Sequence, residues 1–409
     1  MVRNVKERSS RTFLNNIIEL LIPVYMCTVF IFSFNTDLNI YSKLIALLLI
    51  GFTGLYFLTK KTFVFDTFPR LLVSFWCFCL LTYFWAWEPD LVVEKCITLF
   101  QVVVLAYLVY NYLVKENKLN YFIGCLCFST TFFAIYTVFY FGVEEYFAGL
   151  DDGIRMGEEI ANVNTVGVYA AMAVLINLWY VFYKKRYWQL ILVALCSVVA
   201  LGSGSRKAII AMVIGIAFMF VVTGDKKKRL KGLLLAILLL TILFFVFQLP
   251  IFSTINRRVE LMFETFSGTH SGGSTDTRMK MIDIGISQFI KTPLGGIGIG
   301  NSVVLIKQEI GLSTYLHNNY AELLASVGII GTIIYYLLYF IPLRHFLSSK
   351  KLKHPEVTLS IILVFVSLIL HYGKVAFVDK MEYMFILFYF LVIKSVNSGN
   401  ENEQNIKSN

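Results

Sequence analysis

Charged side chains are scarce in this sequence, and their scarcity excludes a water-soluble protein. Lysine, arginine, aspartate and glutamate make up 15% of the 409 residues, whereas 57% are hydrophobic, and the mean hydropathy is +0.71. Soluble domains carry charge on roughly a quarter of their residues. The apolar residues recur in runs of about 20, the length that a helix needs to cross a bilayer. We therefore predict an all-α, polytopic integral membrane helical bundle.

Signatures of metal, redox and secreted proteins are also missing. All seven cysteines lie in apolar runs and form no CxxC pair, so we expect them to be packing residues. The histidines show no HExxH spacing and the acidic residues no DxD pair, so no metal and no cofactor is predicted. The basic amino terminus leads directly into a full-length apolar run without a small-residue cleavage site, which predicts a first helix rather than a cleaved signal.

The positive charge follows membrane topology. The formal net charge is +10, but the cations fall mostly in short loops between apolar runs, which argues against nucleic-acid binding. Every second loop is rich in lysine and arginine, and such loops stay on the cytoplasmic side. Both termini are therefore predicted to be cytoplasmic.

About twelve transmembrane helices are predicted, in a single domain over residues 1–396. A long extracytoplasmic loop at about 250–319 is expected to contain short helices at 254–266 and 276–291, and residues 397–409 a disordered cytoplasmic tail. The predicted spans are 17–34, 40–58, 71–87, 92–113, 119–141, 163–183, 188–203, 207–223, 232–249, 320–343, 357–373 and 381–395.

Several arginines lie on the predicted outer side, where the positive-inside pattern predicts few cations. Arg206 lies in the segment 202–207 between two apolar runs, with almost no loop to carry its charge into water. An unpaired arginine at membrane depth costs at least about 2.5–3.5 kcal/mol, so such a residue usually faces a cavity or an anion. The planar guanidinium group of arginine can donate two hydrogen bonds to a phosphate, so phosphate is a suitable anion. The alternative is that the Arg206 side chain snorkels to the membrane interface. The other outer arginines are Arg155, Arg278, Arg257 and Arg258. A solvated loop position is the alternative for Arg155, and lipid headgroups are the alternative ligands for Arg257 and Arg258.

His317 begins the predicted helix 320–343 at the outer membrane face. An imidazole there could accept a proton from a hydroxyl, since its ordinary pKa is about 6.5; a helix-capping or interfacial role is the alternative. Glu322 follows Asn318 by one turn and could orient a side chain of the site, or be an ordinary satisfied polar residue. The glycines at 296–300 follow no strand, so they predict a tight re-entry into the membrane rather than a dinucleotide loop. Gly328 and Gly331 predict close helix packing.

In chain order, these motifs resemble the bacterial O-antigen polymerase and O-antigen ligase superfamily of polytopic glycosyltransferases, which use polyprenyl-linked sugars. The matching elements are Gly-Ser-Gly-Ser-Arg at 202–206, Arg278 with Pro-Leu-Gly-Gly-Ile-Gly at 293–298, His317–Leu324 with Gly328 and Gly331, and the less specific set Arg155, Gly157 and Asn164.

The resemblance implies an enzyme at the outer face of the bacterial cytoplasmic (inner) membrane. Arg206 and Arg278 would hold the pyrophosphate of an undecaprenyl-diphosphate-linked glycan, and His317 would lie beside the acceptor hydroxyl as base or orienter. Arginines can neutralise the leaving group without a metal. The remaining substrate-binding residues expected are Arg155, Ser205, Asn318 and Glu322.

The sequence is compatible with two activities of the superfamily and with one function of a different class. A polymerase joins a growing glycan to the next lipid-linked repeat unit, whereas a ligase moves a finished glycan to a lipid A core or another acceptor. The Ser-Gly-Ser-Arg-Lys-Ala context and the short His-Asn spacing favour the polymerase. A transporter or flippase of lipid-linked glycan is the further alternative, although charges clustered at one face argue against it. Expected partners are membrane lipids, a chain-length regulator and a flippase.

Overall fold

The computed structural model describes residues 2–32, 38–60, 63–151, 160–222, 274–347 and 354–407, together with a few positions between these ranges. Within them every regular element is a helix. The α-helices are α1 (Val2–Phe32), α2 (Asn39–Lys60), α3 (Thr67–Leu81), α4 (Pro89–Lys115), α5 (Leu119–Phe141), α6 (Val143–Asp151), α7 (Val163–Lys184), α8 (Leu190–Gly202), α9 (Arg206–Val221), α12 (Ser274–Lys291), α13 (Ser302–Ile310), α14 (Asn319–Phe346), α15 (Pro355–Leu370) and α16 (Lys380–Lys407).

The all-α, polytopic architecture expected from the sequence is confirmed. Seven helices in the described residues are long and apolar enough to cross a membrane: α1 from Phe13, α2, α3 with the short 3-10 turn that follows it, α4, α5, α7 and α14. Eleven of the twelve predicted spans coincide with helices of the structure. The predicted helices 232–249 and 254–266 lie largely or wholly outside the described residues, so they stay predictions.

Three details differ from the sequence-based expectation. The short helices α6 and α13 were not predicted, because nine residues give too little periodicity to distinguish a helix from a loop. The third difference concerns the tail, where α16 continues as helix through 397–407 instead of ending before a disordered segment.

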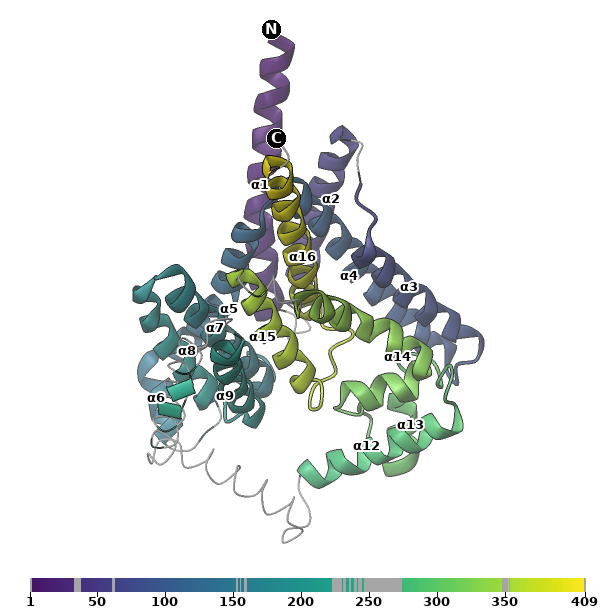
Figure 1. Ribbon diagram of the computed structural model, residues 1–409. Helices are drawn as coiled ribbons and strands as arrows, with labels where there is room; N and C mark the ends of the chain where they lie inside the picture. The colour runs from purple at the N-terminus through teal and green to yellow at the C-terminus, as the bar shows by residue number, and fades with distance from the viewer. Residues whose placement is uncertain are drawn as a thin grey trace.

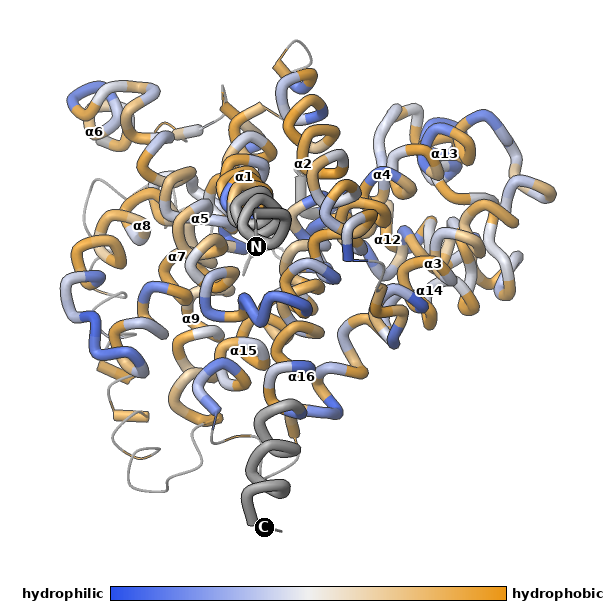
Figure 2. The backbone as a smooth tube through the Cα atoms, turned by 90° about the horizontal axis from the view of Figure 1, so that it is seen from above, coloured by the Kyte–Doolittle hydropathy of each residue, from blue (hydrophilic) through white to orange (hydrophobic). Residues whose placement is uncertain are grey.

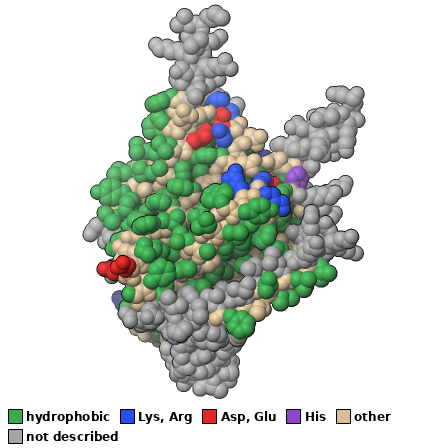
Figure 3. All heavy atoms as spheres, turned by 90° about the vertical axis from the view of Figure 1, so that its left-hand side faces the viewer, with side chains coloured by type: hydrophobic (Ala, Val, Ile, Leu, Met, Phe, Trp, Pro, Cys, Tyr) green, Lys and Arg blue, Asp and Glu red, His purple; other side chains and the backbone are tan. Residues whose placement is uncertain are grey.

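Both termini lie at one end of the molecule, and α6, α12 and α13 lie towards the other (Figure 1). Seen from the end with the N-terminus, hydrophobic residues run along most of the helices (Figure 2). Hydrophobic side chains also cover most of the described part of one lateral face (Figure 3), as expected for contact with lipid tails. Helix α7 packs against α5, α8 and α9 and is buried along most of its length, which explains why it is apolar all round.

Helix α14 is broken at Gly328, and the segment that follows α12 fits into the break. The amides of Ile297 and Gly298 donate to the carbonyls of Ala325 and Ser326, both at 2.9 Å. A Cβ added to Gly328 would lie 2.4 Å from the carbonyl carbon of Leu294, and the backbone there has φ +63°. The close packing predicted at Gly328 is therefore a contact between two backbone segments, which the missing side chain of glycine permits. This contact fixes the position of α12 relative to α14.

Candidate functional site

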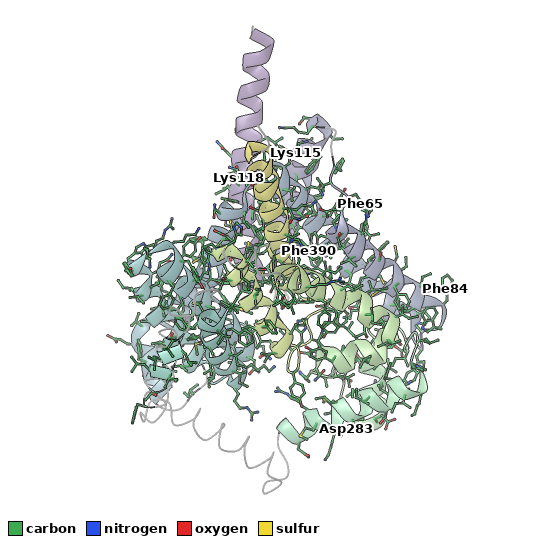
Figure 4. All side chains as sticks on the ribbon, in the orientation of Figure 1. Phe65, Phe84, Lys115, Lys118, Asp283 and Phe390 are labelled. Atoms are coloured by element: carbon green, nitrogen blue, oxygen red, sulfur yellow. The ribbon has the colours of Figure 1, made fainter. Side chains whose placement is uncertain are left out.

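A cavity of about 680 Å³ opens among the helix ends that point away from the termini. Its lining comes from the end of α1, the starts of α2, α4, α7 and α9, one residue of α12, the loop before α14 and the α15–α16 connection. Figure 4 shows Lys115 and Lys118 near the terminal end of the molecule and Asp283 of α12 at the opposite end. The cavity thus lies in the half of the bundle that the charge pattern assigns to the outer side.

Cationic side chains dominate the charge of this cavity. The cations in its lining are Lys43, Lys207, Arg278, Lys374 and Lys380, and the carboxylates are Glu94 and Asp379. Five positive charges against two negative ones leave an excess of three when His317 is neutral. Such an excess in a site partly shielded from water favours a ligand with several negative charges.

His317 lines the same cavity and is held in an uncommon backbone conformation, with φ +56°. Its Nε2 lies 3.3 Å from Thr314 Oγ1, and its ring centroid lies 4.3 Å from that of Tyr315. Burial, followed by the charges of Arg278 and Lys207, lowers the pKa of His317 to about 4. The imidazole is therefore neutral near pH 7 and has a lone pair available for a proton.

Glu322 and Asn318 hold the chain around His317 without lining the cavity. Both side chains are buried. The Glu322 carboxylate accepts hydrogen bonds from the Leu316 amide at 3.0 Å and from the Ser302 hydroxyl. Asn318 caps α14 by accepting from the Ala321 amide at 2.9 Å, and it donates to the carbonyl of Tyr372 at 3.0 Å. These contacts position the residues on both sides of His317.

The α15–α16 connection brings a second charged group to the cavity. Lys374 Nζ lies 2.6 Å from Asp379 Oδ2 and 3.3 Å from Glu382 Oε2, and it donates to the Tyr169 hydroxyl at 3.1 Å. Although burial alone lowers the pKa of Lys374, Asp379, Tyr169 and Glu382 raise it well above its ordinary value. Lys374 therefore stays charged, and its charge is balanced locally by the two carboxylates.

Lys207 connects this loop to α9, because its ammonium donates to the carbonyl of Gly373. The bond joins two segments 166 residues apart in sequence. Lys207 consequently belongs both to the lining of the cavity and to the contacts that hold its shape.

The structure brings Arg278 and His317 into one cavity, as the sequence predicts. Arg206 begins α9 and is partly buried, but its neighbour Lys207 is the residue that lines the cavity. Ser205 is fully buried, and its hydroxyl has no hydrogen-bond partner among the described residues. Arg155, Arg257 and Arg258 lie outside the described residues, so their roles stay predictions.

Sequence reasoning missed most of the cations of this cavity: Lys43, Lys207, Lys374 and Lys380. The signal was present, because all four fall near the outer ends of predicted spans and so break the positive-inside pattern in the same way as the arginines. Among cationic residues, the prediction of a site from the sequence rests on the arginines alone. Tyr169 gave no such signal, since a tyrosine within an apolar run is common.

Residues 191–336 match the protein-family model described as O-antigen ligase. The match extends from α8 into α14 and includes Lys207, Arg278 and His317, whereas α1–α7 lie outside it. It supports the resemblance to the O-antigen ligase and polymerase superfamily, and with it a multi-pass membrane enzyme of glycosyltransferase type. No curated protein matches the chain.

Proposed function

We propose that the protein is a surface-polysaccharide polymerase, acting on O-antigen or capsule repeat units, which transfers a glycan from an undecaprenyl-diphosphate donor to a sugar hydroxyl of a lipid-linked repeat unit. The observation that carries this proposal is the cationic cavity around His317. The family match over 191–336 supports the broader class of O-antigen ligase or polymerase.

The cations suit a diphosphate leaving group. In the transfer, the acceptor oxygen forms a bond to the anomeric carbon while the bond between that carbon and the diphosphate oxygen breaks. Negative charge then develops on the diphosphate, and Arg278 and Lys207, which line the cavity, would stabilise it. Metal independence, predicted from the sequence, remains part of the proposal.

His317 would accept the proton of the acceptor hydroxyl. Burial, together with the charges of Arg278 and Lys207, lowers the pKa of His317 and makes it a weak base. A bound diphosphate would offset these two charges and raise the pKa of the imidazole towards its ordinary value. Donor binding would thereby strengthen the base when the acceptor hydroxyl is to lose its proton.

The polymerase is favoured over the ligase by the residues around Arg206 and by the spacing of His317 and Asn318, which resemble polymerases. The ligase alternative uses the same donor chemistry and differs in its acceptor. A flippase, the remaining alternative, would need access from both sides, whereas the described lining of the cavity lies at one set of helix ends.

Alanine variants of Arg206, Arg278 and His317 in the bacterium that makes the protein test the proposal. Lys280→Ala is a matched control, because Lys280 lies two residues from Arg278 on α12, is exposed, and pairs with Asp276 at 3.0 Å instead of lining the cavity. Surface glycans are extracted and separated on a gel, and the amount of each variant in the membrane is measured.

Single-repeat products in place of a long ladder, with lipid-linked repeats accumulating, would support the polymerase. Long lipid-linked chains that never reach their acceptor would identify a ligase instead. An unchanged ladder in Arg278→Ala and His317→Ala, at normal membrane levels, would contradict the catalytic assignment.

A further inference from the structure

Helix α4 presents a polar face to the cavity, in the part of the chain that the family match leaves out. Glu94, Ile97, Thr98 and Gln101 all line the cavity. Their spacing of three and four residues places them on one side of the helix. From Glu94 to Gln101 this face extends roughly 10 Å, at 1.5 Å per residue.

The polar residues of this face extend to membrane depth. Gln101 lies twelve residues after Pro89, the first residue of a 27-residue apolar helix, and so about 18 Å along it. Its side chain is exposed and has no hydrogen-bond partner among the described residues. An amide in hydrocarbon without partners costs several kcal/mol. The cavity must therefore supply Gln101 with water or with polar groups of a ligand.

The chemistry of the face differs from that of the rest of the cavity. The described residues of α4 contribute a carboxylate, a hydroxyl and an amide to the lining, and no cation. Glu94 pairs with Lys95 at 3.3 Å, but the Glu94 side chain is 66% exposed, and such a pair leaves most carboxylate lone pairs available. The Thr98 hydroxyl donates to the carbonyl of Glu94 at 3.2 Å and keeps its own lone pairs for an incoming donor.

We infer that Glu94, Thr98 and Gln101 bind hydroxyl groups of the sugars in the lipid-linked glycan. A sugar hydroxyl both donates and accepts, and it is complementary to a mixed set of carboxylate, hydroxyl and amide. Phosphate is unsuited to this face because Glu94 would repel it. The cavity then has two parts: the cations Lys207 of α9 and Arg278 of α12 for the diphosphate, and the polar face of α4 for the carbohydrate. This inference rests on the proposed function.

The test uses the purified full-length protein with two probes. One probe is undecaprenyl diphosphate, which has the anion and no sugar, and the other is lipid-linked repeat units extracted from cells that lack this protein. Thr98→Val and Gln101→Leu keep the size of the side chain and remove its polar group. Phe100→Leu is the control, because Phe100 lies beside Gln101 on α4, is 48% exposed and does not line the cavity.

We expect Gln101→Leu to raise the KM for lipid-linked repeat units about tenfold, as for the loss of a hydrogen bond or two. The affinity for undecaprenyl diphosphate should change by less than twofold, and Phe100→Leu should change neither quantity. Arg278→Gln, assayed in parallel, should weaken the binding of both probes.

Unchanged KM values in Thr98→Val and Gln101→Leu, with Arg278→Gln impaired, would overturn the sugar-binding face and leave the proposed function intact. An equal loss of affinity for both probes in Gln101→Leu would also overturn the sugar-binding face. Full transfer activity in Arg278→Gln would contradict the proposed function itself.

Discussion

At the scale of single residues, the reactivity of His317 is determined by what surrounds it. Burial and the neighbouring charges of Arg278 and Lys207 keep the imidazole neutral. Its left-handed backbone is maintained by hydrogen bonds of the residues on either side, because the Leu316 amide donates to Glu322 and Asn318 accepts from the Ala321 amide. A non-glycine residue in that conformation stores strain, which proteins tolerate where a side chain must be aimed.

The lowered pKa of His317 predicts an unusual pH dependence. The base is active when neutral, so kcat/KM should stay level from pH 8 down to about 5 and fall tenfold per unit below pH 4. The acid limb of kcat should lie at higher pH than the acid limb of kcat/KM, because kcat reports the substrate complex, in which the bound diphosphate raises the pKa of His317. Steady-state rates of the purified protein across this range measure both limbs, and a kcat/KM limb near pH 6.5 would show that neither burial nor the cations lower the pKa of His317.

Lys374 is expected to matter for stability more than for binding. Replacing it with methionine removes the ammonium group that pairs with the partly buried Asp379 and the buried Glu382. Removing one partner of a fully buried ion pair costs about 3–5 kcal/mol, which is the upper bound for this change. The double variant Lys374→Met/Glu382→Gln should regain part of this loss, since one uncompensated charge is gone. Thermal unfolding in detergent tests the prediction, and no recovery in the double variant would contradict it.

At the scale of elements, α14 is two helical pieces joined at Gly328, and its break positions Arg278 on α12 relative to His317. Long, strongly apolar helices such as 119–141 were predictable because hydropathy is a local property. The break was not, since it depends on hydrogen bonds from residues 293–298, which are distant in sequence. The convergence of α1, α2 and α4 on the cavity was not predictable for the same reason. Arg278 and His317 were predictable, because an arginine on the outer side and a histidine at the start of an apolar helix are unusual in their local sequence.

Gly328→Ala tests the role of the break. Its backbone, with φ +63° and ψ −168°, lies in a region used almost exclusively by glycine, so strain alone should cost about 1–3 kcal/mol. We expect lower thermal stability and at least a tenfold loss of transfer activity. Gly51→Ala on α2 is the matched control: nothing lies within 4 Å of its added Cβ, and it should gain about 0.5–1 kcal/mol. Equal behaviour of the two variants would rule out the positional role of Gly328.

At the scale of the whole molecule, the proposal requires the cavity to face the outside of the cell. In a variant with the exposed Cys77 replaced by serine, cysteine is introduced at Asp283 or Lys115, which lie at opposite ends (Figure 4). A membrane-impermeant maleimide is added to intact cells, under conditions in which it reaches the outer face of the cytoplasmic membrane. It should label Asp283→Cys and not Lys115→Cys. The reverse pattern would invert the topology and place the cavity in the cytoplasm.

The most direct measurement is the single-turnover rate of glycan transfer by the purified protein, with lipid-linked repeat units as both donor and acceptor. We expect Arg278→Gln and His317→Ala each to slow transfer by at least a hundredfold, while Lys280→Ala reacts at the normal rate. Normal rates in both cavity variants would show that the cationic cavity around His317 is not the place where the glycosidic bond forms.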